Sequence, residues 1–263
     1  MKILFVGDIV GKGGRKAVQA LVPELRREFG ISFCIANAEN MAGGGGMTRK
    51  CVEQMLRAEV DVLTGGGHIW DQRGFDDEIG LYPNVLRPAN LNPGQPGRGW
   101  GVFKAPNGVS VAVISVLGRV FMNGFADCPF MAVDRFLQEI EGQAQVVIVD
   151  MHAEATSEKH AMGWYLDGRA SAVLGTHTHV PTADQRILPQ GTAVQCDVGM
   201  VGSRNSVLGR DVSAVVRRFS TGMPTRFKVV EDDIRLHGAI VTVDEAGRAV
   251  DIQAVSRDYH ETP

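Results

Sequence analysis

The first 64 residues alternate apolar runs with amphipathic segments, and this alternation constrains the fold more than any other feature. Residues 2–7, 31–37 and 60–64 are predicted strands, because each is a short apolar run with a sharp stop. Residues 15–29 and 48–58 carry apolar side chains at helical spacing, with Thr48 as the expected N-cap of the second helix. This β-α-β-α-β order is typical of a parallel sheet with helices on its faces.

The rest of the chain predicts a mixed sheet. Asn107-Gly108 lies between two apolar runs and is a strong hairpin signal. The further predicted strands are 101–104, 109–116, 145–150, 171–175, 192–196, 239–243 and 249–255, and the further helices are 130–140 and 157–166. Because no linker or repeat interrupts the pattern, residues 1–263 are expected to form a single α/β domain.

Composition excludes several classes of protein. A net charge of −3 without a basic run argues against stable nucleic-acid binding. No apolar stretch reaches the roughly 18 residues of a membrane helix, and the N-terminus lacks a signal-peptide pattern. The four cysteines form no CxxC pair, which favours reduced thiols and a cytoplasmic location. Glycine is in excess, with 32 residues, and the glycine clusters at 43–46 and 65–67 mark special loops.

Five predicted strands lead directly into side chains that bind metals or transfer protons. In chain order these are Asp8, then Glu39 with Asn40, then His68, then Asp150 with His152, and finally His177 with His179. Open α/β sheets bind ligands outside the carboxyl ends of their strands. The sequence therefore predicts one convergent site at that edge.

His177 and His179 form a His-x-His pair, whose side chains would point the same way in an extended segment. Together with His152 they favour a metal site over structural histidines. Carboxylate oxygens from Asp8 and Glu39 beside imidazoles suit Fe, Mn or Zn better than Ca.

Each of these residues also has an ordinary structural interpretation. Asp8 could be a helix cap, Glu39-Asn40 an exposed loop pair, and Asp150 either a support for a histidine or a strand terminus. Arg119 and Arg169 could each contact phosphate or form a surface ion pair. No site role is expected for His160, His237 and His260.

His68 lies in a glycine-rich loop, where a histidine can donate a proton to a leaving group. The alternative is a histidine that only packs or caps. Other catalytic motifs are missing from the sequence, since it contains neither a P-loop nor a GxSxG elbow, and no cysteine has a catalytic context.

Several longer motifs resemble those of one known family. They are FVGDIVGKGGR, NAENMAGGGGMT, GGGHIWD, LGRVFM, DMHAEATSEK, GTHTHVPTADQRIL and QCDVGM, which run nearly from end to end. They resemble the calcineurin-like metallophosphoesterase superfamily, most closely its YmdB-like branch, described as 2′,3′-cyclic-nucleotide 2′-phosphodiesterases. The resemblance implies a metallophosphatase-type mixed β-sandwich flanked by helices.

The resemblance also implies a site with two metal ions. Asp8, Glu39, Asn40 and His179 would hold one ion, and Glu39 would bridge to a second ion held by His152 and His177. The metals would be iron, with manganese as a substitute, and a hydroxide between them would attack a cyclic nucleotide while His68 acts as the general acid. A homo-oligomer is compatible with this expectation, because symmetric dimers are common.

Gly67 departs from the family pattern. The family loop reads Gly-Asn-His, and its asparagine binds the second metal, whereas Gly67 has no side chain. We expect weaker binding of the second metal. This departure motivates an alternative, a catalytically weakened metal-binding regulatory relative. A metallohydrolase acting on a carbon–nitrogen or ester bond is a further alternative.

Overall fold

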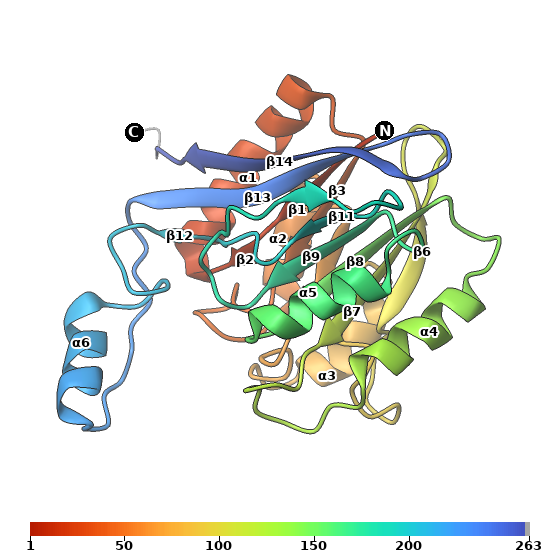
Figure 1. The fold of residues 1–263 in the computed structure, drawn as a ribbon. Coiled ribbons are helices and arrows are strands. Elements are labelled where there is room, and N and C mark those ends of the chain that lie inside the picture. The colour runs from red at the N-terminus through yellow and green to blue at the C-terminus, as the bar shows by residue number, and fades with distance from the viewer. Residues whose placement is uncertain (261–263) are drawn as a thin grey trace.

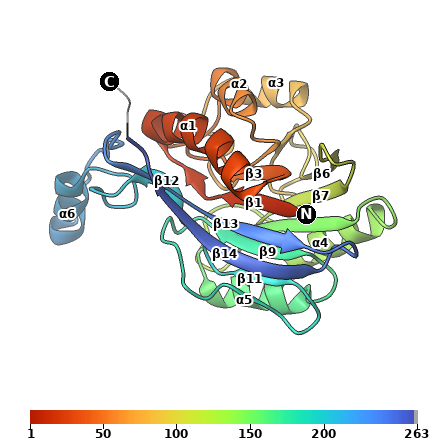
Figure 2. The same cartoon turned by 90° about the horizontal axis from the view of Figure 1, so that it is seen from above.

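The computed structural model describes residues 1–260, in which two β-sheets pack face to face with helices on both outer sides (Figures 1 and 2). The first sheet has the order β2 (Asp8–Ile9), β12 (Met200–Ser203), β13 (Ile234–Val243), β1 (Lys2–Val6), β3 (Phe33–Asn37), β4 (Val62–Thr64) and β5 (Val85–Leu86), and β14 (Ala249–Asp258) pairs with β13. The second sheet has the order β10 (Arg186–Ile187), β11 (Ala193–Gln195), β9 (Ala172–Thr176), β8 (Val146–His152), β7 (Ser110–Leu117) and β6 (Trp100–Lys104).

Strand directions confirm the predicted mixed architecture. β1, β3, β4 and β5 run parallel, as the N-terminal alternation predicts, and β13 pairs antiparallel with β1. In the second sheet β7, β8, β9 and β11 are parallel, whereas the edge strands β6 and β10 are antiparallel to their neighbours. Both predicted hairpins form, as β6–β7 and β13–β14.

The core follows from the two-residue period of the strands. In β1, Ile3 and Phe5 face the second sheet, whereas Leu4 and Val6 face the helices. The helices α1 (Gly11–Phe29) and α2 (Arg49–Arg57) cover the first sheet, and α4 (Pro129–Glu139) and α5 (Thr156–Tyr165) cover the second (Figure 2). Thr48 is the N-cap of α2, since its side chain accepts a hydrogen bond from the Cys51 amide.

Helix α1 begins at Gly11, four residues before the predicted start. Glycine disfavours helix interiors, so the local propensity was misleading. Tertiary packing explains the difference, because a Cβ atom at Gly14 would overlap the Val201 carbonyl on β12. The Glu231 carboxylate accepts hydrogen bonds from the amides of Lys12 and Gly13 and so caps the helix from a distant segment.

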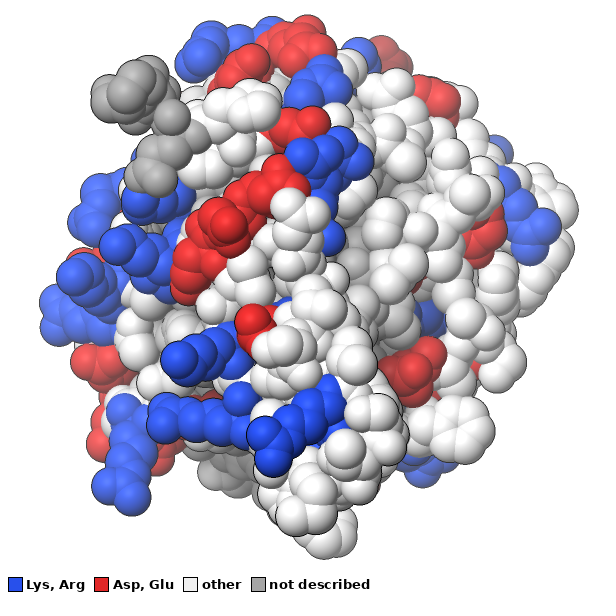
Figure 3. Space-filling model, turned by 90° about the vertical axis from the view of Figure 1, so that its left-hand side faces the viewer, with Lys and Arg blue, Asp and Glu red and all other residues white. Residues whose placement is uncertain are grey.

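The sequence did not predict the short elements β5, β10, β12, α3 (Phe75–Glu78) and the 3₁₀ turn Ile79–Leu81, or helix α6 (Val212–Thr221). Helix α6 lies apart from the sandwich in Figures 1 and 2, and Val215 is its buried residue. Its other apolar side chains, such as Val212, Val216 and Phe219, are exposed and do not pack on a core. Figure 3 shows this side of the molecule, where Lys and Arg side chains gather beside Asp and Glu side chains.

Among residues 1–260, none of the helices combines the length and apolar character that crossing a bilayer requires.

Candidate metal centre

The predicted site residues meet where the carboxyl ends of strands from both sheets converge. Glu39 and Asn40 follow β3, His68 follows β4, and His177 and His179 follow β9. Asp8 begins β2. His152 is the last residue of β8, so this strand runs two residues further than predicted.

Glu39, His152 and His177 form one close group, with one ligand atom from each lying within 4.8 Å of the others. The Glu39 Oε1 atom is 3.1 Å from His152 Nε2, and His177 Nδ1 is also 3.1 Å from His152 Nε2. The two imidazole rings pack edge to face with centroids 4.8 Å apart. Three ligand atoms at this spacing can share one metal ion.

Asp8, Asn40 and His179 form a second group beside the first. Asn40 Nδ2 is 3.2 Å from His179 Nε2, and Asp8 Oδ1 is 3.8 Å from the same nitrogen. Asn40 also donates to Glu39 Oε1 at 3.1 Å, so Glu39 contacts both groups.

Asp8 Oδ1 is fully buried and has no hydrogen-bond partner among the described residues. The other oxygen, Oδ2, accepts the His177 amide at 3.1 Å. A buried carboxylate oxygen without a partner is costly unless a cation neutralises it. The donor set, two carboxylates with an amide and three imidazoles, therefore fits a pair of transition-metal ions.

The pKa shifts show that the buried ionisable groups of this cluster interact strongly with one another. Burial, the Glu39 charge and the Asp197 charge raise the pKa of Asp8, despite the opposing effect of His152. Burial would lower the pKa of His152, but Glu39 and the nearby aspartates raise it to about 9. Burial and the His152 charge lower the pKa of His177 to about 4. A bound cation would relieve the repulsion between the two carboxylates.

The backbone of the His-x-His segment differs from the extended conformation expected from sequence. His177 and His179 have φ angles of 99° and 64°, a region that costs non-glycine residues conformational energy. The two side chains still contact His152 and Asn40, respectively. They do so because of this strained turn, and not because alternate residues of a strand point the same way. The Asp197 carboxylate fixes the turn, because it accepts the Thr178 amide at 3.0 Å and the Thr178 hydroxyl at 2.8 Å.

Asp150 supports the site without facing the cluster. Its carboxylate accepts hydrogen bonds from Asn37 at 3.0 Å and from Thr176 at 2.7 Å. Thr176 Oγ1 in turn lies 2.9 Å from His152 Nδ1, and the register of β8 with β9 places Thr176 opposite His152. Asp150 thereby orients the imidazole through intermediate side chains.

His68 lies at the rim of a cavity of about 290 Å³ next to the two groups. Its amide donates to Glu39 Oε2 at 3.0 Å, and its Nδ1 is 2.8 Å from Asp71 Oδ2. The ring is half-exposed, so it can meet a ligand in the cavity. The lining residues are Glu39, Asn40, His68, Glu154, His177, Thr178, His179, Leu208 and Arg210.

The loop glycines have different surroundings. A Cβ atom at Gly66 would overlap both Glu39 Oε2 and His152 Nε2, so only glycine fits against the cluster. A Cβ atom at Gly67 would meet nothing within 4 Å, and this residue has an ordinary φ angle. A side chain at position 67 is therefore sterically acceptable.

Sequence reasoning missed Arg210 and Glu154, which line the cavity. Neither has a recognisable motif, and Arg210 reaches the site from a distant segment by donating to the Gly44 carbonyl. Neither of the two arginines considered from sequence lines this cavity. Arg169 pairs with Asp134 at 2.5 Å, which supports the ion-pair interpretation for that residue.

Comparisons with known proteins identify the family of this chain. The sequence model of a family described as YmdB-like protein matches residues 4–255. A 2′,3′-cyclic-nucleotide 2′-phosphodiesterase of Bacillus subtilis (strain 168) is 45% identical over 256 residues, covering 97% of this chain and 96% of the relative.

Two solved structures share the fold. A hypothetical protein from Thermus thermophilus superposes with a TM-score of 0.91 and 42% identity, over 98% of this chain and 99% of the other. A structure described as a novel phosphatase from Mycoplasma pneumoniae also gives a TM-score of 0.91, with 31% identity over 98% of this chain and 93% of the other. The architecture is thus that of the metallophosphatase-type sandwich.

Proposed function

This chain belongs to the YmdB-like protein family, and on that premise we propose that it is a metal-dependent phosphodiesterase of 2′,3′-cyclic nucleotides. The names of the B. subtilis and M. pneumoniae relatives support a phosphoesterase. The observation that carries the metal dependence is the buried, unpartnered Asp8 Oδ1 beside the His179 and Glu39 side chains. Without a cation, nothing offsets a charge on this oxygen, and burial raises the pKa of the Asp8 carboxyl instead.

Asp8, Glu39, Asn40 and His179 would hold one ion, and Glu39, His152 and His177 the other. We propose iron at these positions, with manganese as a functional substitute, because mixed carboxylate and imidazole ligands suit both. When bound, the ions would supply an activated water and positive charge for the phosphate oxygens. A cytoplasmic location belongs to the same proposal and rests on the four cysteines, which are free thiols in the structure.

The side chains around the cavity have distinct roles in this proposal. His68 gives a proton to the ribose oxygen that leaves phosphorus, and Asp71 orients its ring. Arg210 adds a positive charge to the cavity wall. Gly66 keeps the approach to Glu39 and His152 clear of side-chain atoms.

A turnover assay with controlled metal content tests the proposal. The protein is stripped with a chelator, and hydrolysis of 2′,3′-cyclic AMP is followed without metal, with Mn²⁺ and with Fe²⁺. We expect no turnover in the stripped protein and recovery with either ion, with the 3′-phosphate as product if the 2′ bond is cleaved. Asp8→Asn should not recover, because it removes the anionic ligand while preserving shape.

Because Gly67 has no side chain to bind a metal, one alternative is a metal-binding relative with weakened catalysis. A panel of phosphomonoesters, phosphodiesters, amides and carboxylic esters separates the three candidate functions. If none of the phosphoesters is hydrolysed in a metal-dependent way, the proposed phosphodiesterase is ruled out. Hydrolysis of an amide or a carboxylic ester alone would favour the other class of metallohydrolase.

A further inference from the structure

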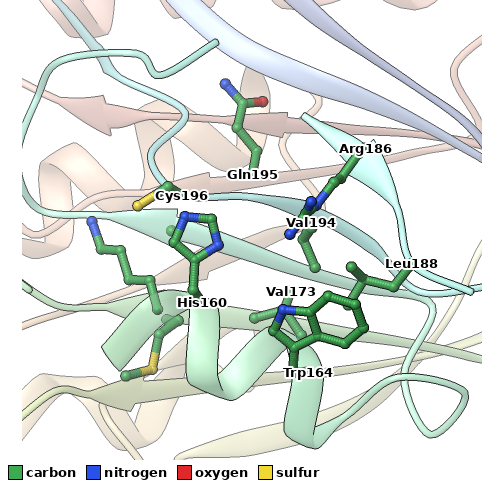
Figure 4. A pocket seen from close by; sticks show the side chains of 11 residues that line it. His160, Trp164, Val173, Arg186, Leu188, Val194, Gln195 and Cys196 are labelled. Atoms are coloured by element: carbon green, nitrogen blue, oxygen red, sulfur yellow. The ribbon is translucent and has the colours of Figure 1, made fainter. Parts of the chain in front are cut away.

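A second group of metal-binding side chains lies outside the centre described above. His160 belongs to α5, Asp184 lies between β9 and β10, and Cys196 directly follows β11. One ligand atom from each residue lies within 4.8 Å of the other two. Figure 4 shows the His160 imidazole reaching from α5 toward Cys196.

One distance in this group equals that between two ligand atoms of a tetrahedral ion. His160 Nε2 is 3.4 Å from Asp184 Oδ2. Two atoms that each lie about 2.1 Å from one tetrahedral ion are about 3.4 Å apart. The His160 and Asp184 side chains are 40% and 30% exposed, so both can adjust to bring the remaining distances into range.

The Asp184 carboxylate is already oriented. Its Oδ1 and Oδ2 atoms accept the Cys196 amide at 3.1 and 3.2 Å. Cys196 thus supplies a thiol ligand through its side chain and holds the carboxylate ligand through its backbone. Such hydrogen bonds to ligands fix their direction toward a metal.

We propose that His160, Asp184 and Cys196 bind one zinc ion at a site separate from the two-metal centre. Cysteine sulfur, histidine nitrogen and carboxylate oxygen all bind zinc, and thiolate favours zinc over the harder metals. The six side chains of the two-metal centre include no sulfur. The two sites therefore differ in donor chemistry.

The surroundings permit this site. A cavity of about 10 Å³ lies beside His160 and Cys196, close to the space of one water molecule, which can complete the coordination. Two cations are near. Lys159 is neutralised by Asp197 at 2.8 Å, and the Arg186 guanidinium lies over the Trp164 ring, 5.6 Å from its centroid. A thiolate and a carboxylate together would balance the charge of the zinc ion.

Burial raises the pKa of the Cys196 thiol. Zinc binding must displace this proton, so metal uptake should release acid and strengthen with rising pH.

The zinc ion would join α5 to the segment after β11. The next residue, Asp197, holds the Thr178 turn between the two active-site histidines. The site would therefore stabilise the wall behind His177 and His179 without contacting a substrate.

Cobalt substitution tests this proposal by a signal that the two-metal centre cannot produce. The full-length protein is titrated with CoCl₂, and absorption is recorded in the near ultraviolet, where thiolate-to-cobalt charge transfer appears. We expect this band in the wild type and its loss on addition of ZnCl₂. It should be absent in Cys196→Ser and present in Cys128→Ser, a control at a half-buried free thiol outside the group.

His160→Gln serves as the second variant, because the side chain is partly exposed and its replacement should not impair folding. We expect weaker cobalt binding at the thiolate site, by at least about tenfold, with circular dichroism unchanged. A wild type without the charge-transfer band, or a band that survives Cys196→Ser, would overturn the zinc site. Neither result depends on whether the protein is a phosphodiesterase.

Discussion

At the scale of single residues, Asp8 and Glu39 are two buried carboxylates with different surroundings. Both carboxylates are buried, yet only Glu39 has hydrogen-bond partners for both of its oxygens. Burial raises the pKa of Asp8, whereas the interactions with His152 outweigh burial and lower the pKa of Glu39. Such a pair is unfavourable alone and favourable around cations.

Replacing His68 tests its role as a proton donor. His68→Ala should lower kcat on 2′,3′-cyclic AMP by about 10²–10⁴-fold. The loss should be much smaller on a nitrophenyl phosphodiester, whose leaving group needs no proton. His260→Ala, at an exposed residue remote in sequence from the site, is the control. An equal loss on both substrates would indicate a structural role for His68 and contradict general acid catalysis.

Gly67→Asn tests the missing ligand. The structure has open space for this side chain, so the variant should fold normally. We expect the affinity for the weaker Mn²⁺ ion to rise by about tenfold or more, measured by calorimetric titration. Gly80→Asn is a matched control, because a Cβ atom there also meets nothing within 4 Å. An unchanged affinity would mean that position 67 does not reach the metals.

At the scale of elements, the β11–β12 connection supports the candidate metal centre through one buried ion pair. Lys159 on α5 donates to Asp197 at 2.8 Å, and both side chains are almost completely buried. Lys159→Met should lower the free energy of unfolding by about 3 kcal/mol, because Asp197 would keep a buried charge without its cation. Urea denaturation measures this, with the exposed edge-strand residue Lys104→Met as control. A change below about 0.5 kcal/mol would contradict this assignment.

The sequence predicted elements whose local pattern agrees with the tertiary structure. Apolar strands such as β1, β3 and β8 could be predicted because burial on both faces leaves a continuous apolar run. The first turn of α1 could not be predicted, because groups distant in sequence pack against its glycines and accept their hydrogen bonds. Helix α6 was missed although Val212, Val215, Val216 and Phe219 have helical spacing and Asp211 is its N-cap.

The candidate site also has features that could be predicted from the sequence and features that could not. The convergence of residues that follow strands could be predicted, because topology alone brings strand ends together. Asn37, Thr176 and Asp197 could not, since their roles depend on hydrogen bonds across 113, 26 and 19 residues of chain. The turn at His177 was also wrongly expected to be extended, because strain of this kind has no local sequence signal.

At the scale of the whole molecule, metal-free protein should depend on pH in a defined way. His152 has a raised pKa of about 9, so its contribution to stability is present below pH 6.5 and is lost as pH rises toward 9. His177 has a lowered pKa of about 4, so its contribution is lost as pH falls from 6.5 toward 4. The contributions of these two histidines are together largest near pH 6.5, and the raised pKa of Asp8 adds to the loss of stability as pH rises.

Chelator-treated protein, unfolded with urea across this range, provides the measurement. Added Mn²⁺ should restore stability near pH 9, because the ion replaces the proton on the cluster and binds only the folded state. A metal-free protein whose stability rises steadily from pH 6.5 to pH 9 would contradict the charge arrangement inferred for His152.

The central claim is that carboxylates and imidazoles from both sheets enclose two metal ions. Anomalous diffraction from crystals grown with Mn²⁺ tests it most directly. We predict two peaks about 3.5–4 Å apart, one among Asp8, Asn40 and His179 and one between His152 and His177, with Glu39 touching both. A single peak, or strong peaks only away from these residues, would contradict a two-metal centre.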